Sequence, residues 1–184
     1  MIPIRTYEGQ DVAVFGLART GLAAARALEA GGARVHAWDD SPLARDRAEA
    51  QGIALSDINA RDWRGFAALV LSPGVPVTFP RPHRVVDLAR AVGVPVISDI
   101  ELFAQAVNAL SPTMRPKVIG VTGTNGKSTT SALIGHILEA AGRDVRVGGN
   151  IGAAVLDLKP LHAGAHYVLE LSSYQLELTH SLRC

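Results

Sequence analysis

Short apolar runs alternate with longer amphipathic stretches along most of this chain. The runs at residues 12–16, 34–40 and 67–74 are rich in Val, Ala and Leu and have the length of buried strands. The stretches between them have helical periodicity, and one of them starts with Ser41 as N-cap and Pro42 in the first turn. Strands that alternate with helices in this way predict an α/β fold with parallel sheets.

A proline-containing break divides this alternation into two parts. Residues 111–117, SPTMRPK, hold two prolines and no apolar period, which is typical of a linker. We therefore predict a Rossmann-like parallel-sheet domain over residues 1–111. The first part of a P-loop ATPase-type α/β domain is expected over residues 112–184. The tail YQLELTHSLRC has no pattern that completes a sheet, so we expect this second domain to continue beyond residue 184.

Composition narrows the class of protein. The chain is 48% hydrophobic and 19% charged with a formal net charge of +1, so we expect no nucleic-acid partner and no membrane insertion. Its single cysteine, Cys184, cannot form an internal disulfide, which suits a reducing compartment. No signal peptide and no apolar run of about 20 residues is apparent, so we expect a cytoplasmic protein.

A glycine-rich turn, GLARTG at residues 16–21, follows the first predicted strand and starts a helix. This is the context of a dinucleotide fingerprint, although Ala18 stands where that fingerprint has glycine. Asp39, at the end of the next strand, is placed to bind a ribose hydroxyl, and the turn at Ser72–Gly74 follows a further strand. The turn predicts either a nucleotide site, including that of a nicotinamide-dependent oxidoreductase, or a tight turn without a ligand.

The stretch GVTGTNGKST, residues 120–129, has the order of a phosphate-binding loop: strand, glycine loop, Lys-Ser and helix. The strict P-loop pattern requires glycine at position 121, where this chain has Val121, and its glycine lies at Gly123 instead. Lys127 supplies a cation for the outer phosphates of a nucleotide, and the Ser128 hydroxyl suits Mg²⁺. The pattern therefore predicts a nucleotide site of variant spacing.

A carboxylate partner for the metal is Glu170, at the end of the apolar run YVLE. The glycine-rich stretch VGGNIG, residues 147–152, surrounds Asn150 and indicates close approach of the backbone to a ligand or to a neighbouring segment. Three histidines lack metal-ligand spacing, and we expect them at the surface: His162, His166 and His180.

These segments together resemble a known family. GVTGTNGKST is similar to the ATP loop of the Mur ligases, which has the displaced glycine. VFGLARTGLAAARAL, LSPGV, SDIELF, VGGNIG and LELSSYQLE resemble the branch of that family that adds D-glutamate. The resemblance implies an ATP-dependent ligase of peptidoglycan precursor synthesis. It would phosphorylate the carboxylate of UDP-N-acetylmuramoyl-L-alanine and then form an amide with D-glutamate. It also implies ATP and Mg²⁺ as cofactors and a monomeric full-length protein.

The resemblance assigns roles to individual residues. ATP would be held by Gly123, Thr124, Asn125, Gly126, Lys127, Ser128 and Thr129. Catalysis would involve Lys127 and Glu170, and Mg²⁺ would be bound by Ser128 and Glu170. The UDP-sugar substrate would contact Arg19, Thr20, Asp39, Gly74 and Asn150. The family's remaining metal ligands and its C-terminal domain would lie beyond residue 184, so we expect this chain alone to be inactive. A NAD-dependent oxidoreductase and a non-catalytic nucleotide-binding module are the alternatives.

Overall fold

The computed structural model describes the whole chain, residues 1–184, and contains two parallel β-sheets with helices around them. The strands are β1 (Asp11–Phe15), β2 (Arg34–Trp38), β3 (Phe66–Leu71), β4 (Val96–Ile97), β5 (Lys117–Val121), β6 (Asp144–Gly149) and β7 (Ala165–Glu170). The α-helices are α1 (Arg19–Ala30), α2 (Pro42–Ala50), α3 (Arg84–Ala91), α4 (Asp99–Ala109), α5 (Lys127–Ala140) and α6 (Ser173–Glu177). Short 3₁₀ helices span Ile58–Ala60, Trp63–Gly65, Pro112–Met114 and Val155–Asp157. The α/β fold class with parallel sheets, expected from the alternating pattern, is confirmed.

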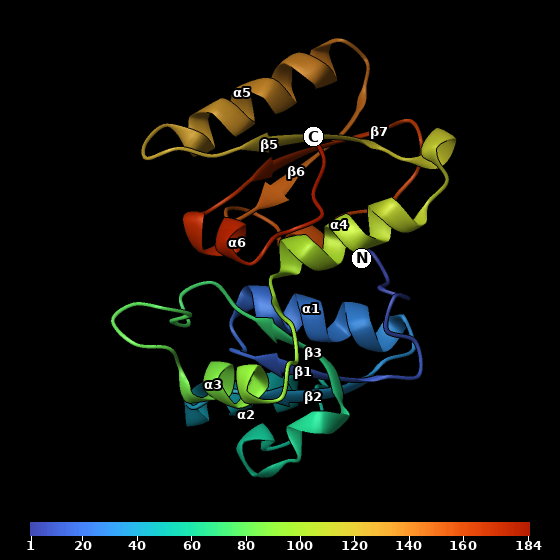
Figure 1. Ribbon diagram of the computed structural model, residues 1–184. Helices are drawn as coiled ribbons and strands as arrows, with labels where there is room; N and C mark the ends of the chain where they lie inside the picture. The colour runs from blue at the N-terminus through green and yellow to red at the C-terminus, as the bar shows by residue number, and fades with distance from the viewer.

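The first sheet has the strand order β2-β1-β3-β4 and is buried on both faces. Strand β1 lies inside it, with Val12 and Val14 in one core cluster and Ala13 and Phe15 in another. Successive side chains of a strand point to opposite faces, so both faces of β1 must be covered by helices. In Figure 1, α1 lies on one side of this sheet, and α2 and α3 lie on the other.

The second sheet has the order β5-β7-β6. Its register aligns Glu170 at the end of β7 with Val121 of β5 and with Gly149 of β6. The three strands therefore end at one edge, where the loop before α5 also begins. Helix α5 covers the outer face of this sheet, and α4 lies on the other side, between the two sheets (Figure 1).

Helix starts follow two different patterns. Ser41, Ser98 and Ser172 accept a hydrogen bond from a backbone N–H in the first turn of α2, α4 and α6. Helices α1 and α5 start at Ala18 and Gly126, and neither N-cap makes a side-chain hydrogen bond. The first backbone N–H groups of α1 and α5 are thus available to an anion, as the predicted nucleotide sites require.

One hydrophobic core crosses from the first sheet to the second. It includes Val14 of β1, Phe103 of α4 and Tyr167 of β7, and the rings of Phe103 and Tyr167 lie 5.2 Å apart between centroids. The backbone N–H of Ile2 donates to the carbonyl of Leu156 at 2.8 Å, which joins the N-terminus to the second sheet. The domain boundary at residue 111 stays a prediction, because the packing is continuous across it.

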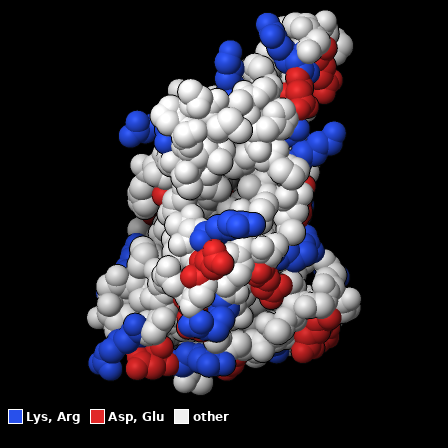
Figure 2. Space-filling model, turned by 90° about the vertical axis from the view of Figure 1, so that its right-hand side faces the viewer, with Lys and Arg blue, Asp and Glu red and all other residues white.

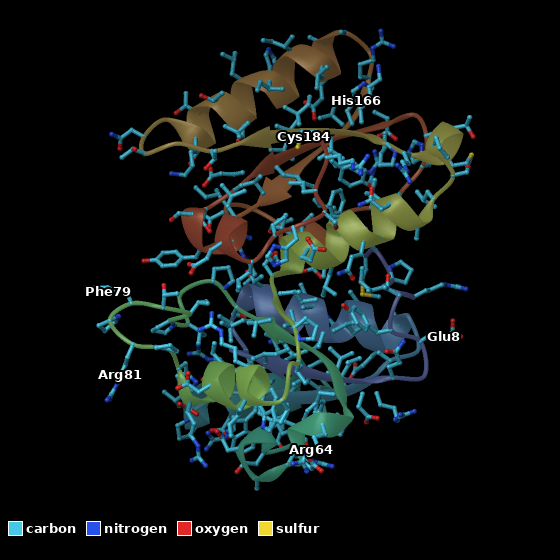
Figure 3. The ribbon with its side chains drawn as sticks, viewed as in Figure 1. Glu8, Arg64, Phe79, Arg81, His166 and Cys184 are labelled. Carbon is cyan, nitrogen blue, oxygen red and sulfur yellow. The ribbon has the colours of Figure 1, made fainter.

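The surface carries mixed charge. Figure 2 shows Lys and Arg side chains interspersed with Asp and Glu on the face that it presents. No helix is both long enough and apolar enough to span a membrane. His162 and His180 are exposed, as expected. His166, labelled in Figure 3, is half-buried and its Nδ1 has no hydrogen-bond partner, so its surface assignment was only partly right.

Candidate functional site

The loop between β5 and α5 has the backbone of an anion cradle. Gly123 and Gly126 take positive φ angles of 143° and 77°, a region that side chains with a Cβ rarely adopt. The backbone N–H groups of Lys127, Ser128 and Thr129 make no backbone hydrogen bond, because the first helical bond runs from Thr130 N to Gly126 O. These donors and the positive end of the helix dipole favour a phosphate at this loop.

The Lys127 side chain folds back over the loop. Its Nζ donates to the carbonyl oxygen of Gly123 at 2.9 Å and approaches that of Thr124 at 3.4 Å. These contacts keep the ammonium above the cradle, where the outer phosphates of a nucleotide would meet it. Thr124, Asn125 and Ser128 are exposed around the same loop, so the structure brings the predicted ATP-binding residues together.

Glu170 lies at the end of β7 with 2% of its surface exposed. Its Oε1 accepts from Asn150 Nδ2 at 3.1 Å, and its backbone carbonyl accepts from Asn150 N at 2.8 Å. Its other carboxylate oxygen, Oε2, is buried without a hydrogen-bond partner. A buried carboxylate oxygen left unpaired is costly, so this atom needs a cation, a water molecule or a proton.

The residues around Glu170 fit a magnesium ion. A cavity of about 140 Å³ is lined by Ser128 and Glu170, the two residues that the sequence pattern assigns to the metal. One carboxylate and one hydroxyl suit Mg²⁺, which keeps several waters and takes its other ligands from substrate phosphates. The chain has no group of three or more His, Cys, Asp or Glu side chains that could hold a metal ion.

A second and larger cavity, about 540 Å³, opens beside the loop. Its wall combines loop residues Gly123 and Lys127 with Asn150 and with Ser172 and Tyr174 from the segment after β7. A molecule in this cavity would touch the cation of Lys127 and the hydroxyls beyond Glu170 at once. Asn150 thus faces both Glu170 and the larger cavity, and its contact with the substrate stays a prediction.

The carboxyl edge of the first sheet carries the other predicted residues. Ser72 Oγ donates to the carbonyl of Gly16 at 2.6 Å, which joins the turns after β3 and β1. A Cβ atom on Gly21 would lie 1.7 Å from that carbonyl oxygen, so only glycine allows α1 to pack here. Thr20 in the first turn of α1 and the exposed Gly74 lie at this edge and remain predicted substrate contacts.

Asp39 has a structural role that the sequence did not reveal. Its Oδ2 accepts from Leu17 N at 2.7 Å and its Oδ1 from Ser41 N at 2.8 Å. The carboxylate therefore joins the glycine-rich turn to the start of α2. Its contact with a ribose stays a prediction, and a ligand hydroxyl would have to share oxygens that already accept backbone hydrogen bonds.

Arg19 connects the two sheets. Its guanidinium donates to the carbonyl of Asn150 at 2.6 Å and to that of Gly152, and it approaches the carbonyl of Gly149 at 3.4 Å. A Cβ atom on Gly149 would lie 2.4 Å from the carbonyl oxygen of Glu170, so at this glycine the close approach is to a neighbouring strand. Arg19 places the turn after β1 next to the loop after β6, which brings the two predicted sites together.

Two acidic residues of α4 hold the C-terminal segment, and their hydrogen bonds were not predicted from the sequence. Gln175 Nε2 donates to the Asp99 carboxylate at 3.0 Å, and Glu101 accepts from the backbone of His180 and Ser181 at 2.7 and 2.9 Å. Burial alone would raise the pKa of Glu101, but these hydrogen bonds outweigh it and lower the pKa. The capping-box pattern at Ser172 and Gln175 was a readable signal for α6.

Comparison with known proteins identifies the class. Residues 121–184 match the family described as Mur ligase middle domain. Together with the phosphate loop and Glu170, and with curated relatives that match along the whole chain, this match shows that the chain belongs to the Mur ligase family.

The particular relatives share one name, UDP-N-acetylmuramoylalanine--D-glutamate ligase. The protein of Phenylobacterium zucineum (strain HLK1) is 64% identical over 182 residues, which cover 99% of this chain and 39% of the relative. That of Caulobacter vibrioides (strain NA1000 / CB15N) is 62% identical over 183 residues, or 100% of this chain and 39% of the relative. That of Brucella abortus (strain 2308) is 54% identical over 182 residues, or 99% of this chain and 38% of the relative. The chain thus spans about two-fifths of the length of these relatives.

Proposed function

We propose that this chain is part of an ATP-dependent ligase of the cytoplasm. The ligase would join D-glutamate to UDP-N-acetylmuramoyl-L-alanine during peptidoglycan precursor synthesis. The observation that carries the proposal is the open phosphate loop beside the buried, unpaired Oε2 of Glu170. The name shared by the similar proteins supplies the two organic substrates. The proposal includes a monomeric whole protein, in which ATP and Mg²⁺ bind at the loop.

The residues of the loop would have separate roles in binding ATP and in transferring its phosphoryl group. The free N–H groups of Lys127, Ser128 and Thr129 would bind the phosphates, and the Lys127 ammonium would offset charge on the phosphoryl group in transfer. Glu170 and Ser128 would hold Mg²⁺, which supplies Lewis-acid stabilisation to phosphate oxygens. The acceptor carboxylate would enter the cavity between Lys127 and Ser172. Phosphorylation of that carboxylate makes it reactive toward the amine of D-glutamate, with phosphate as the leaving group.

The first sheet would hold the UDP part of the substrate at its carboxyl edge. The free N–H groups of Arg19, Thr20 and Gly21 at the start of α1 suit the diphosphate. Arg19 and Asn150 join this edge to the second cavity, so a UDP-sugar bound at α1 can extend toward the loop. In this arrangement one UDP-sugar molecule would reach from the start of α1 to the phosphate loop.

Calorimetric titration of the 184-residue chain tests the binding part of the proposal. We expect UDP-N-acetylmuramoyl-L-alanine to bind and Asp39→Ala or Thr20→Ala to weaken it. The magnesium complex of AMP-PNP should also bind, and Lys127→Ala should lower its affinity by about 100-fold because the cation at the phosphates is lost. Lys159→Ala is the matched control, since its side chain is exposed away from both cavities. Binding of NADH in place of the UDP-sugar would instead support an oxidoreductase.

A chimera separates an enzyme from a non-catalytic binding module. The chain would be joined to the downstream part of the Phenylobacterium zucineum relative, and ATP turnover would be measured with and without D-glutamate. We expect turnover that depends on D-glutamate and that Lys127→Ala abolishes. A folded chimera that binds both nucleotides without turnover would contradict the catalytic part of the proposal.

A further inference from the structure

Ser131 lies one turn beyond Ser128 on α5, and both line the 140 Å³ cavity that holds Glu170. Residues three apart in a helix share one face. The cavity wall therefore carries two hydroxyls from α5 opposite one carboxylate from β7. Ser128 is exposed, whereas Ser131 is only 3% exposed.

The Ser131 hydroxyl has no hydrogen-bond partner. A serine inside a helix commonly donates to the carbonyl four residues earlier, which here is that of Lys127, but Ser131 does not make this bond. Two buried polar atoms in one small cavity, Ser131 Oγ and Glu170 Oε2, thus lack partners. Native proteins rarely leave such atoms unpaired, so both require a partner inside the cavity.

The cavity has room for that partner. At roughly 30 Å³ for each water molecule, a volume of about 140 Å³ holds several waters. Three lining residues, Ser128, Ser131 and Glu170, carry hydroxyl or carboxylate groups that can hydrogen-bond to water, whereas Ala132, Val147 and Ile151 are apolar. A hydroxyl can accept from one water and donate to another, which fits it to the outer shell of a hydrated cation.

We propose that Ser131 is a positioning residue for the magnesium site: its hydroxyl, through an ordered water, holds the Glu170 carboxylate in the orientation that binds the ion. This inference rests on the proposed function, because it takes the nucleotide-bound Mg²⁺ at Ser128 and Glu170 as its reference. Ser131 acts through water and Glu170 and does not itself touch ATP. Partners beyond the direct ligands of a metal fix the geometry of those ligands, and their loss typically lowers metal affinity by about 10- to 100-fold.

The test compares the affinity of AMP-PNP with and without magnesium in the 184-residue chain. Calorimetry gives the dissociation constant in excess EDTA and in excess Mg²⁺, and the ratio of the two measures the magnesium enhancement. Ser131→Ala should lower this ratio about tenfold while the magnesium-free affinity stays unchanged. Ser131→Cys, which keeps the size of the side chain but donates weakly, should lower it as well and serves if the alanine variant does not fold. Thr130→Ala, an exposed hydroxyl loss on the neighbouring residue, should leave the ratio unchanged.

The outcomes separate this inference from the proposed function. If the unaltered chain fails to bind AMP-PNP under both conditions, the proposed function and the inference are both wrong. If it binds without any magnesium enhancement, the metal site and the inference are wrong but the nucleotide site stands. An equal ratio in the Ser131 variants and in Thr130→Ala overturns the inference alone. A parallel loss of affinity with and without magnesium assigns Ser131 a merely structural role, which also overturns it.

Discussion

Gln175 donates its side-chain amide to the carboxylate of Asp99 at 3.0 Å, and each residue is only 1% exposed. This hydrogen bond joins the start of α4 to α6. Burial raises the pKa of Asp99 to about 6, although the hydrogen bonds from Gln175 and from the backbone N–H of Ile100 act to lower it. The segments SDIELF and ELSSYQLE, on which the family resemblance rests, thus meet at a carboxyl group whose pKa is raised by burial.

The raised pKa of Asp99 predicts a pH-dependent stability. The folded state keeps a proton on Asp99 that the unfolded state releases near pH 3.8. The contribution of this proton to the free energy of unfolding is therefore fully present only below pH 3.8. It is lost as the pH rises through about 6, and the difference is about 3 kcal/mol. Urea melts of the unaltered chain and of Asp99→Asn at pH 4, 6 and 7.5 measure it.

The Asn variant cancels the other titrations, because it retains every other carboxylate. We expect the variant to gain stability relative to the unaltered chain as the pH rises from 4 to 7.5, by about 2.5 kcal/mol of that difference. A constant difference across this range would contradict the raised pKa of Asp99.

Glu101 anchors the last residues of the chain to α4. Its carboxylate accepts from His180 N, from Ser181 N and, at 2.7 Å, from the Ser181 hydroxyl. Both backbone N–H groups donate to Oε2, whereas Oε1 accepts from the Ser181 hydroxyl and the Gln105 amide. Glu101→Gln puts a donor in place of one oxygen and removes the negative charge that strengthens the hydrogen bonds to the other. We expect a loss of about 1–3 kcal/mol in the free energy of unfolding and faster amide exchange at residues 180 and 181. Glu49→Gln on the exposed side of α2 is the control and should leave both unchanged.

Gly21 provides a test of the close approach between α1 and the turn after β1. Gly21→Ala places a methyl group at 1.7 Å from the Gly16 carbonyl oxygen, so the turn has to move. We expect a loss of more than about 3 kcal/mol in the free energy of unfolding. Gly65→Ala meets no atom within 4 Å and has an ordinary φ, so it should cost less than about 0.5 kcal/mol. Similar melting curves for the two variants would contradict the close packing at Gly21.

Arg19→Met tests the contact between the two sheets. The variant leaves the carbonyls of Asn150 and Gly152 without their donor, so the loop after β6 should loosen. We expect faster exchange of the Asn150 amide and a loss of about 1 kcal/mol, modest because the site is partly open to water. Arg143→Met, which removes an exposed arginine whose side chain makes no hydrogen bond or ion pair, is the control. Unchanged exchange at Asn150 would argue against a structural role for Arg19.

Much of the fold follows from local patterns in the sequence. The apolar runs around Val12 and Leu69 predicted β1 and β3, and glycines such as Gly31 marked the ends of helices. Parallel strands end at one edge, and Asp39 and Ser72, which follow two predicted strands, both contact the glycine-rich turn. The register of β7 brings Glu170 level with Val121, next to the loop as expected.

The remaining features depend on partners that are distant in the sequence. Asp99 and Gln175 are 76 residues apart, and no local pattern relates an acid after a short strand to an amide in a later helix. The bridging role of Arg19 could not be predicted because it depends on how the two sheets pack. The burial of Ser131 is of the same kind, since its position on α5 looks no different from that of Thr130 until Glu170 is placed opposite.

The core that passes from Val14 through Phe103 to Tyr167 has a consequence for dissecting this chain. A cut at the predicted boundary of residue 111 would fall in an exposed segment, yet it would strip α4 of its second neighbour and leave Phe103 facing water. The two halves should therefore melt together as one cooperative unit. A small molecule that binds one half should raise the melting temperature of the other half as well.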